Sequence, residues 1–285
     1  VQAMFSVFDI FKRNRQQKSG EIPSGQEAVS PMPGDAREDG LGHAGAQDMR
    51  LAPAIQKEDS EELLKQVTAL HNQTMELAKT VYASPGADLR QARAAIVGLC
   101  GRLVDAPAVS CRACLRVCLA DYPEGQSYLI GHVANVCMMS LHLARGLGFE
   151  RARLLEILEA AFMHDIGMTR FLELANRPQK LTGQEFNEIK KHPQYGLSFV
   201  NEADAGFPAA VFDVIGQEHE RMDGSGYPQG LQDEGIAEAA QIVGLVDVYE
   251  AMLHSRPYRK KQSPSETMTA ILENTSDLVS MSFPD

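Results

Sequence analysis

Hydrophobic side chains recur every three or four residues along most of the chain from about residue 57 onwards. This is the spacing of helices with one apolar face, whereas few stretches alternate with the period of two that strands require. The chain is therefore predicted to be all-α. The first helix carries Leu63, Leu64, Val67, Leu70 and Leu77, and a later one rich in cysteine is expected to end near residue 120. Further helices are predicted at about 127–147, 151–165, 183–191, 193–203, 208–219, 236–254 and 264–275.

Two of these stretches, AAVFDVI and QIVGLVDVYEAM, are rich in β-branched residues and are compatible with strands. Their length and the helical pattern on either side favour helices. One helix start is explicit, because Thr182 is followed three residues later by Glu185, which is the spacing of a capping box.

The organisation changes along the chain at two places. Residues 1–54 are dense in Gly, Pro, Ser and charge without hydrophobic periodicity, which predicts a disordered tail or linker. The segment DYPEGQ at 121–126 predicts a boundary between a helical N-terminal region, 55–122, and a C-terminal domain, 123–285. For the region 55–122 the sequence leaves three roles open: a sensor, a pair of dimerisation helices or a scaffold.

Composition narrows the class of protein. A net charge of -11 argues against a binder of polymeric nucleic acid. No run of about 18 consecutive apolar residues is present, so no transmembrane segment is predicted. Five cysteines are an odd number, which argues against a complete disulfide framework and fits a cytoplasmic protein. Cys111, Cys114 and Cys118 share one helix face; a metal cluster with Cys100 is one interpretation, and a buried apolar face is the favoured one.

Several histidines and carboxylates stand where they can hold metal ions. His164 and Asp165 end an apolar helical run, and about fifty residues later His219 begins HERMDGSGYPQGL. Asp247 interrupts an apolar stretch, where a charge is costly unless it is paired or bound to a metal. These features favour a metal-dependent hydrolase. His43 in the tail and His71 on a polar helix face are not candidates.

The order of these pieces resembles the HD-GYP branch of the HD phosphohydrolase superfamily, which are cyclic di-GMP phosphodiesterases. The resemblance runs from about Tyr128 to Lys261 and is carried by GHVANV, MHDIG, KLTGQEFNEIKKHPQYG, HERMDGSGYPQGL, AAQIVGLVDVYEAM and SRPYRK. It implies an HD-type helical domain with two divalent metal ions, iron or manganese more than zinc. By position, the metal ligands implied are His132, His164, Asp165, His192, Glu218, His219 and Asp247.

The resemblance also implies roles for individual residues. Asp165 is expected to be the catalytic residue that bridges the two ions. Arg256 and Arg259 are expected to bind the phosphates of the substrate. The remaining substrate-binding residues implied, three of which shape the GYP loop together with Pro228, are Lys180, Asp223, Gly226 and Tyr227.

The sequence departs from the family pattern at four positions. Glu218 replaces the first of two consecutive histidines, and Met168 replaces the lysine that usually follows HDIG. Tyr128 replaces a glutamate of the members that bind three metals, which favours two ions here. Glu250 stands where aspartate is usual. The first two departures bear on catalysis more than on the fold.

The function implied is hydrolysis of cyclic di-GMP to linear pGpG, and onward to GMP, in bacterial second-messenger signalling. The alternatives are an HD-GYP domain that binds cyclic di-GMP or a protein without turnover, and a hydrolase of another phosphoester. A homodimer and a signalling-protein partner are both left open. The family usually continues beyond the final SMSFPD with more helix, so a domain truncated at its C-terminus is expected.

Overall fold

The computed structural model of the protein describes residues 61–83, 88–110, 112–122, 127–175, 177, 179–255 and 260–273. The predicted tail 1–54, the two arginines Arg256 and Arg259, and the C-terminal end lie outside the described residues. Helices account for most of the described chain, and the prediction of an all-α fold is confirmed. The helices are α2 (Glu61–Val81), α3 (Leu89–Asp105), η1 (Pro107–Ser110), α4 (Arg112–Cys118), α5 (Tyr128–Gly146), α6 (Arg151–Met163), η2 (Ile166–Phe171), α7 (Leu172–Ala175), α8 (Gly183–Ile189), α9 (His192–Ala203), α10 (Ala209–Gln217), η3 (Asp233–Gly235), α11 (Glu238–Leu253) and α12 (Pro264–Glu273).

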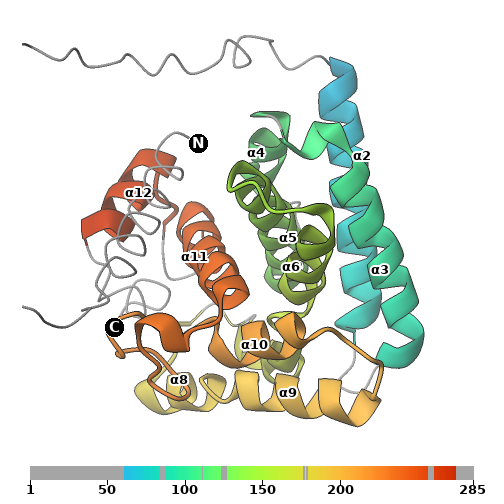
Figure 1. Ribbon diagram of the computed structural model, residues 1–285. Coiled ribbons are helices and arrows are strands. Elements are labelled where there is room, and N and C mark those ends of the chain that lie inside the picture. Colours follow the sequence, from blue (N-terminus) through green and yellow to red (C-terminus); the bar gives the residue numbers. More distant parts are fainter. Residues whose placement is uncertain are drawn as a thin grey trace, which may run out of the picture. The chain divides into compact units, whose positions relative to one another are not determined.

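Helix α5 is the centre of the structure. It is buried on nearly every side, as expected of a helix whose hydrophobic residues surround it. Helices α2, α4, α6 and α11 pack against it. Figure 1 shows α5 and α6 between α2 and α3 on one side and α11 on the other, while α9 and α10 cross one end of this group.

The N-terminal helices pack on the helices that follow residue 123. Helix α2 contacts α5, and α3 contacts α6. The buried face of α2 lies slightly to one side of the leucines that predicted it, because Leu63, Leu64, Leu70 and Leu77 are only half-buried. Its fully buried positions are Val67, His71, Thr74, Met75, Ala78 and Val81. At its end, the hydroxyl of Tyr82 donates a hydrogen bond to the carbonyl oxygen of Phe162 on α6 at 2.7 Å.

The two stretches with strand-like composition are helices α10 and α11, as favoured from the sequence. The capping box is present, since the Thr182 hydroxyl accepts from the Glu185 N–H and the Glu185 carboxylate accepts from the Thr182 N–H. The short helices η2 and α7 were not predicted, because six and four residues are too few to display a hydrophobic period.

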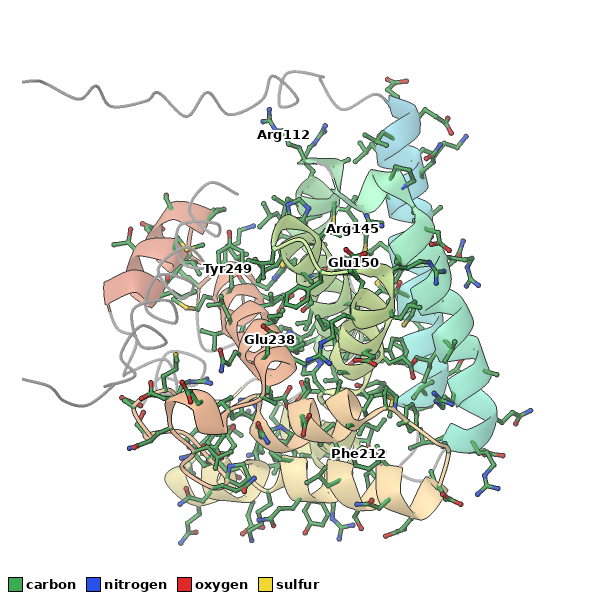
Figure 2. All side chains as sticks on the ribbon, in the orientation of Figure 1. Arg112, Arg145, Glu150, Phe212, Glu238 and Tyr249 are labelled. Atoms are coloured by element: carbon green, nitrogen blue, oxygen red, sulfur yellow. The ribbon has the colours of Figure 1, made fainter. Side chains whose placement is uncertain are left out.

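Charged side chains lie mainly on the outside of the helices. Figure 2 shows Arg112 on α4 pointing away from its neighbours, and this side chain is exposed. None of the described helices has both the length and the apolar character needed to cross a membrane. Four cysteines, Cys100, Cys114, Cys118 and Cys137, are free and buried, and two of them, Cys114 and Cys118 on α4, belong to the predicted apolar face. Cys111 lies outside the described residues.

Candidate metal centre

Two groups of side chains that could hold metal ions meet where the ends of α6, α9 and α10 approach α5 and α11. The first group is His132, His164 and Asp165, and the second is Asp165, His192, Glu218 and His219. Within each group the available ligand atoms all lie within 4.8 Å of one another. Asp165 belongs to both groups. Residues that are far apart in the sequence, and that the family resemblance named as ligands, are thus brought together.

The first group is built around His132, which projects from α5. Its Nε2 atom lies 3.3 Å from Nε2 of His164 and 3.6 Å from Oδ2 of Asp165. Asp247 on α11 places Oδ1 at 3.1 Å from the same Nε2 atom. Two ring nitrogens that face each other with their lone pairs repel unless a proton or a cation lies between them. The arrangement is therefore typical of a cation site.

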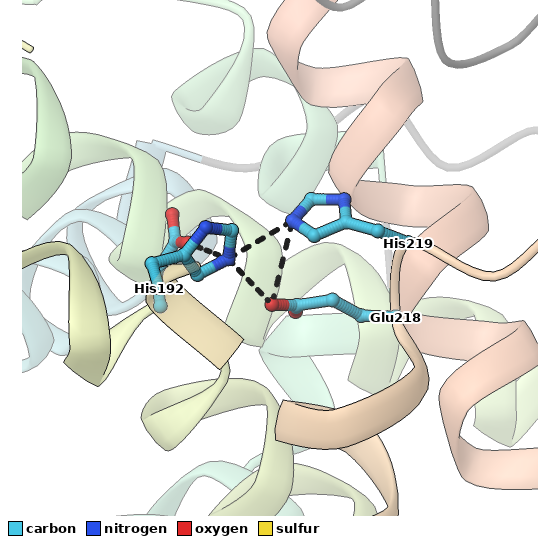
Figure 3. Close-up of side chains that lie close together, drawn as sticks. His192, Glu218 and His219 are labelled. Carbon is cyan, nitrogen blue, oxygen red and sulfur yellow. Dashed lines mark hydrogen bonds and ion pairs between the residues drawn. The ribbon is translucent and has the colours of Figure 1, made fainter. Parts of the chain in front are cut away.

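The second group has the same character, and Figure 3 shows His192, Glu218 and His219 converging. The Nε2 atoms of His192 and His219 are 3.0 Å apart, and Glu218 Oε1 lies 3.5 Å from the first and 3.7 Å from the second. Asp165 contributes Oδ1, at 3.5 Å from His192 Nε2. One oxygen of Asp165 therefore faces each group, which is the arrangement that a bridging ligand requires.

Hydrogen bonds fix which nitrogen of each ring faces the centre. Nδ1 of His164 donates to the carbonyl oxygen of Ala161 at 2.8 Å, and Nδ1 of His192 donates to that of Ile189 at 2.9 Å. A ring whose Nδ1 carries the proton presents the lone pair of Nε2 as a ligand. Both rings therefore expose a ligand atom towards the centre.

The residues present fit divalent ions. Glu218 is fully buried, and its Oε2 atom has no hydrogen-bond partner among the described residues. A buried carboxylate oxygen without a partner is costly unless a cation compensates it. The two groups contain imidazole and carboxylate ligands without a thiolate, which suits ions of the first transition row.

Two glycines allow the backbones that carry the ligands to approach closely. A Cβ atom on Gly167 would lie 1.9 Å from the carbonyl oxygen of His192. A Cβ atom on Gly244 would lie 2.3 Å from the carbonyl oxygen of Glu218. The absence of a side chain at Gly167 therefore sets η2 against the start of α9, and at Gly244 it sets α11 against the end of α10.

The electrostatics of the centre keep the bridging carboxylate ionised. Burial alone would raise the pKa of Asp165, but the imidazoles of His164, His192 and His132 hold this pKa well below its ordinary range. Burial raises the pKa of Glu218 well above its ordinary value. The pKa values of the two carboxylates are therefore shifted in opposite directions, downwards for Asp165 and upwards for Glu218, because Asp165 lies among three imidazoles.

The pKa values of two histidines of the centre are also shifted in opposite directions. Burial alone would lower the pKa of His164, but the carboxylates of Glu218 and Asp165 raise it to about 9. Burial and the neighbouring His192 lower the pKa of His219 to about 3, so its ring is neutral at pH 7. Without a metal ion, His164 therefore carries a proton that an incoming cation must displace.

The loop with the GYP tripeptide is anchored to the second ligand group. The buried carboxylate of Glu220 accepts hydrogen bonds from the backbone N–H groups of Gln229 at 2.6 Å and Leu231 at 2.9 Å. The ring of Tyr227 stacks on that of His219, with centroids 4.7 Å apart and planes inclined by 20°. The Tyr227 N–H donates to the His219 carbonyl oxygen at 3.1 Å. The loop therefore covers one face of the ring of His219, a candidate metal ligand.

The predicted substrate-binding residues occupy different environments. Lys180 and Asp223 are exposed, and Asp223 accepts hydrogen bonds from the backbone and hydroxyl of Ser225, which stabilises the turn. Gly226 packs against the backbone of residues 219–221. Met168, at the position of the usual lysine, is buried and offers no charge.

The sequence did not predict that Lys190 lies beside the GYP loop. The Lys190 ammonium lies 5.1 Å from the ring centroid of Tyr227 and 4.7 Å from that of Phe186. Two aromatic rings therefore hold a cation next to the second ligand group through cation–π contacts. The sequence signal that could have placed Lys190 near the second ligand group was its position two residues before His192.

The residues that orient His132 were also missed. Glu250, seen in the sequence only as a departure, accepts a hydrogen bond from Nδ1 of His132 and another from the amide of Asn135 at 2.9 Å. Burial alone would raise the pKa of Glu250, but His132 and His254 hold it well below its ordinary value. His71, expected on a polar face, is only 8% exposed and bonds to Asn135. The expectation that His71 faces solvent was wrong, because the buried face of α2 passes through it.

A family model described as HD domain matches residues 115–279, which is more than half of the chain. The chain belongs to the HD domain family. This HD domain is 34% identical over 156 residues to a cyclic di-GMP phosphodiesterase of Pseudomonas aeruginosa, covering 54% of this chain and 37% of that protein. It is 36% identical over 132 residues to the cyclic di-GMP phosphodiesterase response regulator RpfG of Xanthomonas campestris pv. campestris, covering 46% and 33%.

A third relative is the 3'3'-cGAMP-specific phosphodiesterase 1 of Vibrio cholerae, 32% identical over 163 residues that cover 55% of this chain and 37% of that protein. The chain thus spans about a third of the length of these relatives. An HDG"Y"P protein from Bdellovibrio bacteriovorus has the same fold, with a TM-score of 0.63 and 17% identity, covering 76% of this chain and 68% of that one. The resemblance of this HD domain to the HD-GYP branch is confirmed.

Proposed function

We propose that this HD domain is a metal-dependent phosphodiesterase that binds two divalent ions and hydrolyses cyclic di-GMP. The observation that carries the proposal is the pair of ligand groups that share Asp165, with one carboxylate oxygen facing each group. Many enzymes that hydrolyse or transfer phosphoesters bind two metal ions a few ångströms apart. Iron and manganese suit a ligand set of imidazoles and carboxylates.

Each side chain has a distinct part in this proposal. His132, His164 and Asp247 would hold one ion, His192, Glu218 and His219 would hold the other, and Asp165 would contribute one carboxylate oxygen to each. Bound ions would supply Lewis acidity towards the phosphodiester and a nucleophile at neutral pH. The chain's own contribution is to fix the imidazoles through their Nδ1 atoms, so that Nε2 remains a ligand without rearrangement.

The substrate class is supported by the relatives and by the loop beside the centre. Relatives at 34% and 36% identity are named as cyclic di-GMP phosphodiesterases. Tyr227 offers an aromatic ring at the edge of the second ligand group, and Lys190 offers a cation. A cyclic dinucleotide has bases that stack on aromatic rings and phosphates that bind cations. Arg256 and Arg259 are proposed as further phosphate ligands.

A second substrate has a specific observation in its favour. A relative at 32% identity is named as specific for 3'3'-cGAMP, which differs from cyclic di-GMP in one base. Hydrolysis of 3'3'-cGAMP uses the same metal centre and the same bond cleavage, so the choice depends on contacts to the bases. Both dinucleotides therefore belong in the test.

The experiment begins with metal analysis of the protein purified without chelator and then reconstituted with Mn²⁺ or Fe²⁺. The protein is incubated with each dinucleotide, and linear dinucleotides and mononucleotides are separated by chromatography. Asp165→Asn is the inactive comparison, and Asp213→Asn on α10, outside both ligand groups, is the matched control that should retain activity.

We expect about two ions per chain and release of a linear dinucleotide. Absence of metal after reconstitution would refute the enzymatic proposal. Tight binding of metal and dinucleotide without product would support the alternative of a binding module. Turnover of 3'3'-cGAMP alone would retain the reaction and change the substrate.

A further inference from the structure

We propose that His71 on α2 is a positioning residue for the metal ligand His132, and that it acts through Asn135 and Glu250. This inference rests on the proposed function, because it assigns a role towards the metal centre. It makes α2, which lies in the N-terminal region 55–122, a structural part of that centre.

Three hydrogen bonds connect α2 to the metal ligand across three helices. Nε2 of His71 lies 2.8 Å from Oδ1 of Asn135 on α5. Nδ2 of Asn135 donates to Oε1 of Glu250 on α11 at 2.9 Å. The other oxygen of Glu250 accepts from Nδ1 of His132. The four side chains are all at least 90% buried, so water competes little for these bonds.

The direction of every bond follows from the chemistry of Glu250. Its carboxylate can only accept hydrogen bonds, so Asn135 must turn its N–H₂ group towards Glu250. The carbonyl oxygen of Asn135 then faces His71, which must donate from Nε2. At the far end, Glu250 requires a proton on Nδ1 of His132, so this ring can bind a metal ion only through Nε2. Donation by His71 is therefore consistent with the arrangement in which Nδ1 of His132 donates to Glu250 and Nε2 faces His164 and Asp247.

The loss of the His71 donor would act on this arrangement directly. The carbonyl oxygen of Asn135 would be buried without a partner, which costs free energy that a shift of the amide towards another donor relieves. Such a shift would weaken the hydrogen bond from Nδ2 of Asn135 to Oε1 of Glu250, and with it the position of that carboxylate. Glu250 stands three residues after Asp247, whose Oδ1 is 3.1 Å from His132 Nε2, so a displaced Glu250 disturbs both sides of the same ring.

The other end of α2 contacts the second helix that supports the first ligand group. The Tyr82 hydroxyl donates to the carbonyl oxygen of Phe162, two residues before His164. Helix α2 thus bonds to residues linked to both His132 and His164. Of the roles left open for the region 55–122, these contacts favour a scaffold.

The test measures the affinity of the protein for Mn²⁺ alone, by calorimetry, in four proteins. These are the wild type, His71→Leu, which removes the donor, His71→Gln, whose amide N–H can occupy the place of Nε2–H, and Thr74→Val. Thr74 is the matched control: it is buried on the same face of α2, and its hydroxyl donates a hydrogen bond to the carbonyl oxygen of Leu70 on its own helix, at 2.9 Å. Thermal melting of each metal-free protein separates loss of stability from loss of affinity.

We expect His71→Leu to weaken the binding of one ion by about tenfold, the lower end of the range for groups that orient metal ligands. His71→Gln should recover most of that affinity, and Thr74→Val should bind Mn²⁺ as the wild type does even if it melts earlier. Equal affinities of His71→Leu and the wild type would overturn the positioning role and leave the proposed function intact. A wild type that binds no Mn²⁺ would refute the proposed function itself, and the positioning role with it.

If His71→Leu does not fold, the variants His71→Gln and His71→Asn test the positioning role of His71 instead. The amide of His71→Gln reaches the place of Nε2, whereas that of His71→Asn is one carbon shorter and does not. His71→Asn should then bind Mn²⁺ more weakly than His71→Gln. Equal affinities of these two variants would overturn the proposal.

Discussion

Replacement of Gly167 by alanine tests whether the close contact between η2 and α9 holds the second ligand group together. A Cβ atom at this position would lie 1.9 Å from the His192 carbonyl oxygen and 2.7 Å from the backbone nitrogen of Gly196. Both atoms belong to the backbone of α9, so no side-chain rotation relieves the contact. To restore a separation of at least 3.0 Å, the start of α9 must move by about 1.1 Å, the difference between 3.0 and 1.9 Å.

A shift of this size is large compared with the tolerance of a metal site. Nε2 of His192 lies 3.0 Å from Nε2 of His219 and 3.5 Å from both Asp165 and Glu218. Metal–ligand distances vary by only about 0.2 Å, so His192 would leave the second group. We expect Gly167→Ala to lose one ion, to lose activity by about 100-fold, and to be destabilised by about 1–3 kcal/mol through overpacking.

The assay combines metal content after reconstitution with Mn²⁺ and dialysis, turnover of cyclic di-GMP, and thermal melting. Gly101→Ala is the control, because a Cβ atom at Gly101 inside α3 would meet no heavy atom of the described residues within 4 Å. Alanine there should stabilise the helix by about 1 kcal/mol and leave metal and activity unchanged. If Gly167→Ala keeps both ions and turns over at the wild-type rate, the contact does not position His192.

Three further predictions concern the ligands themselves. Asp165→Asn should lose most bound metal while its circular dichroism stays helical, because the amide oxygen and nitrogen cannot bridge two cations; metal analysis that finds two ions would contradict the bridge. In the metal-free protein the pKa of His164 is about 9, whereas it is about 6.5 in the unfolded chain. The protonated ring therefore stabilises the folded state fully below pH 6.5, and this stabilisation is lost as the pH rises through 9. Because Mn²⁺ must displace that proton, its affinity should rise about tenfold per pH unit below pH 9, and a calorimetric affinity independent of pH would refute this. Glu218→His should shift the pH–rate profile to lower pH by removing a negative charge from the second ion, and superimposable profiles for the wild type, Glu218→His and Glu218→Ala would exclude a ligand role for Glu218.

Local patterns in the sequence determined the helices and identified the candidate site residues. Whether a segment is helical depends on contacts within a turn or two, so hydrophobic spacing and the capping box of Thr182 and Glu185 sufficed to place most boundaries within a few residues. The adjacency of His164 and Asp165, and the charge of Asp247 within an apolar run, indicated a candidate metal site for a similarly local reason. The cost of burying such polar groups can be seen without knowing their partners.

Only the tertiary structure decided which groups meet. That Asp165 turns one oxygen to His132 and the other to His192 depends on how helices far apart in the sequence pack, and no spacing along the chain encodes it. His71 shows the same limit. It lies four residues after Val67 and four before Met75, on the buried face of α2, but a polar side chain weakens the apolar pattern that reveals such a face. Its place was settled by Asn135, 64 residues away, which provides the acceptor that makes burial of a histidine favourable.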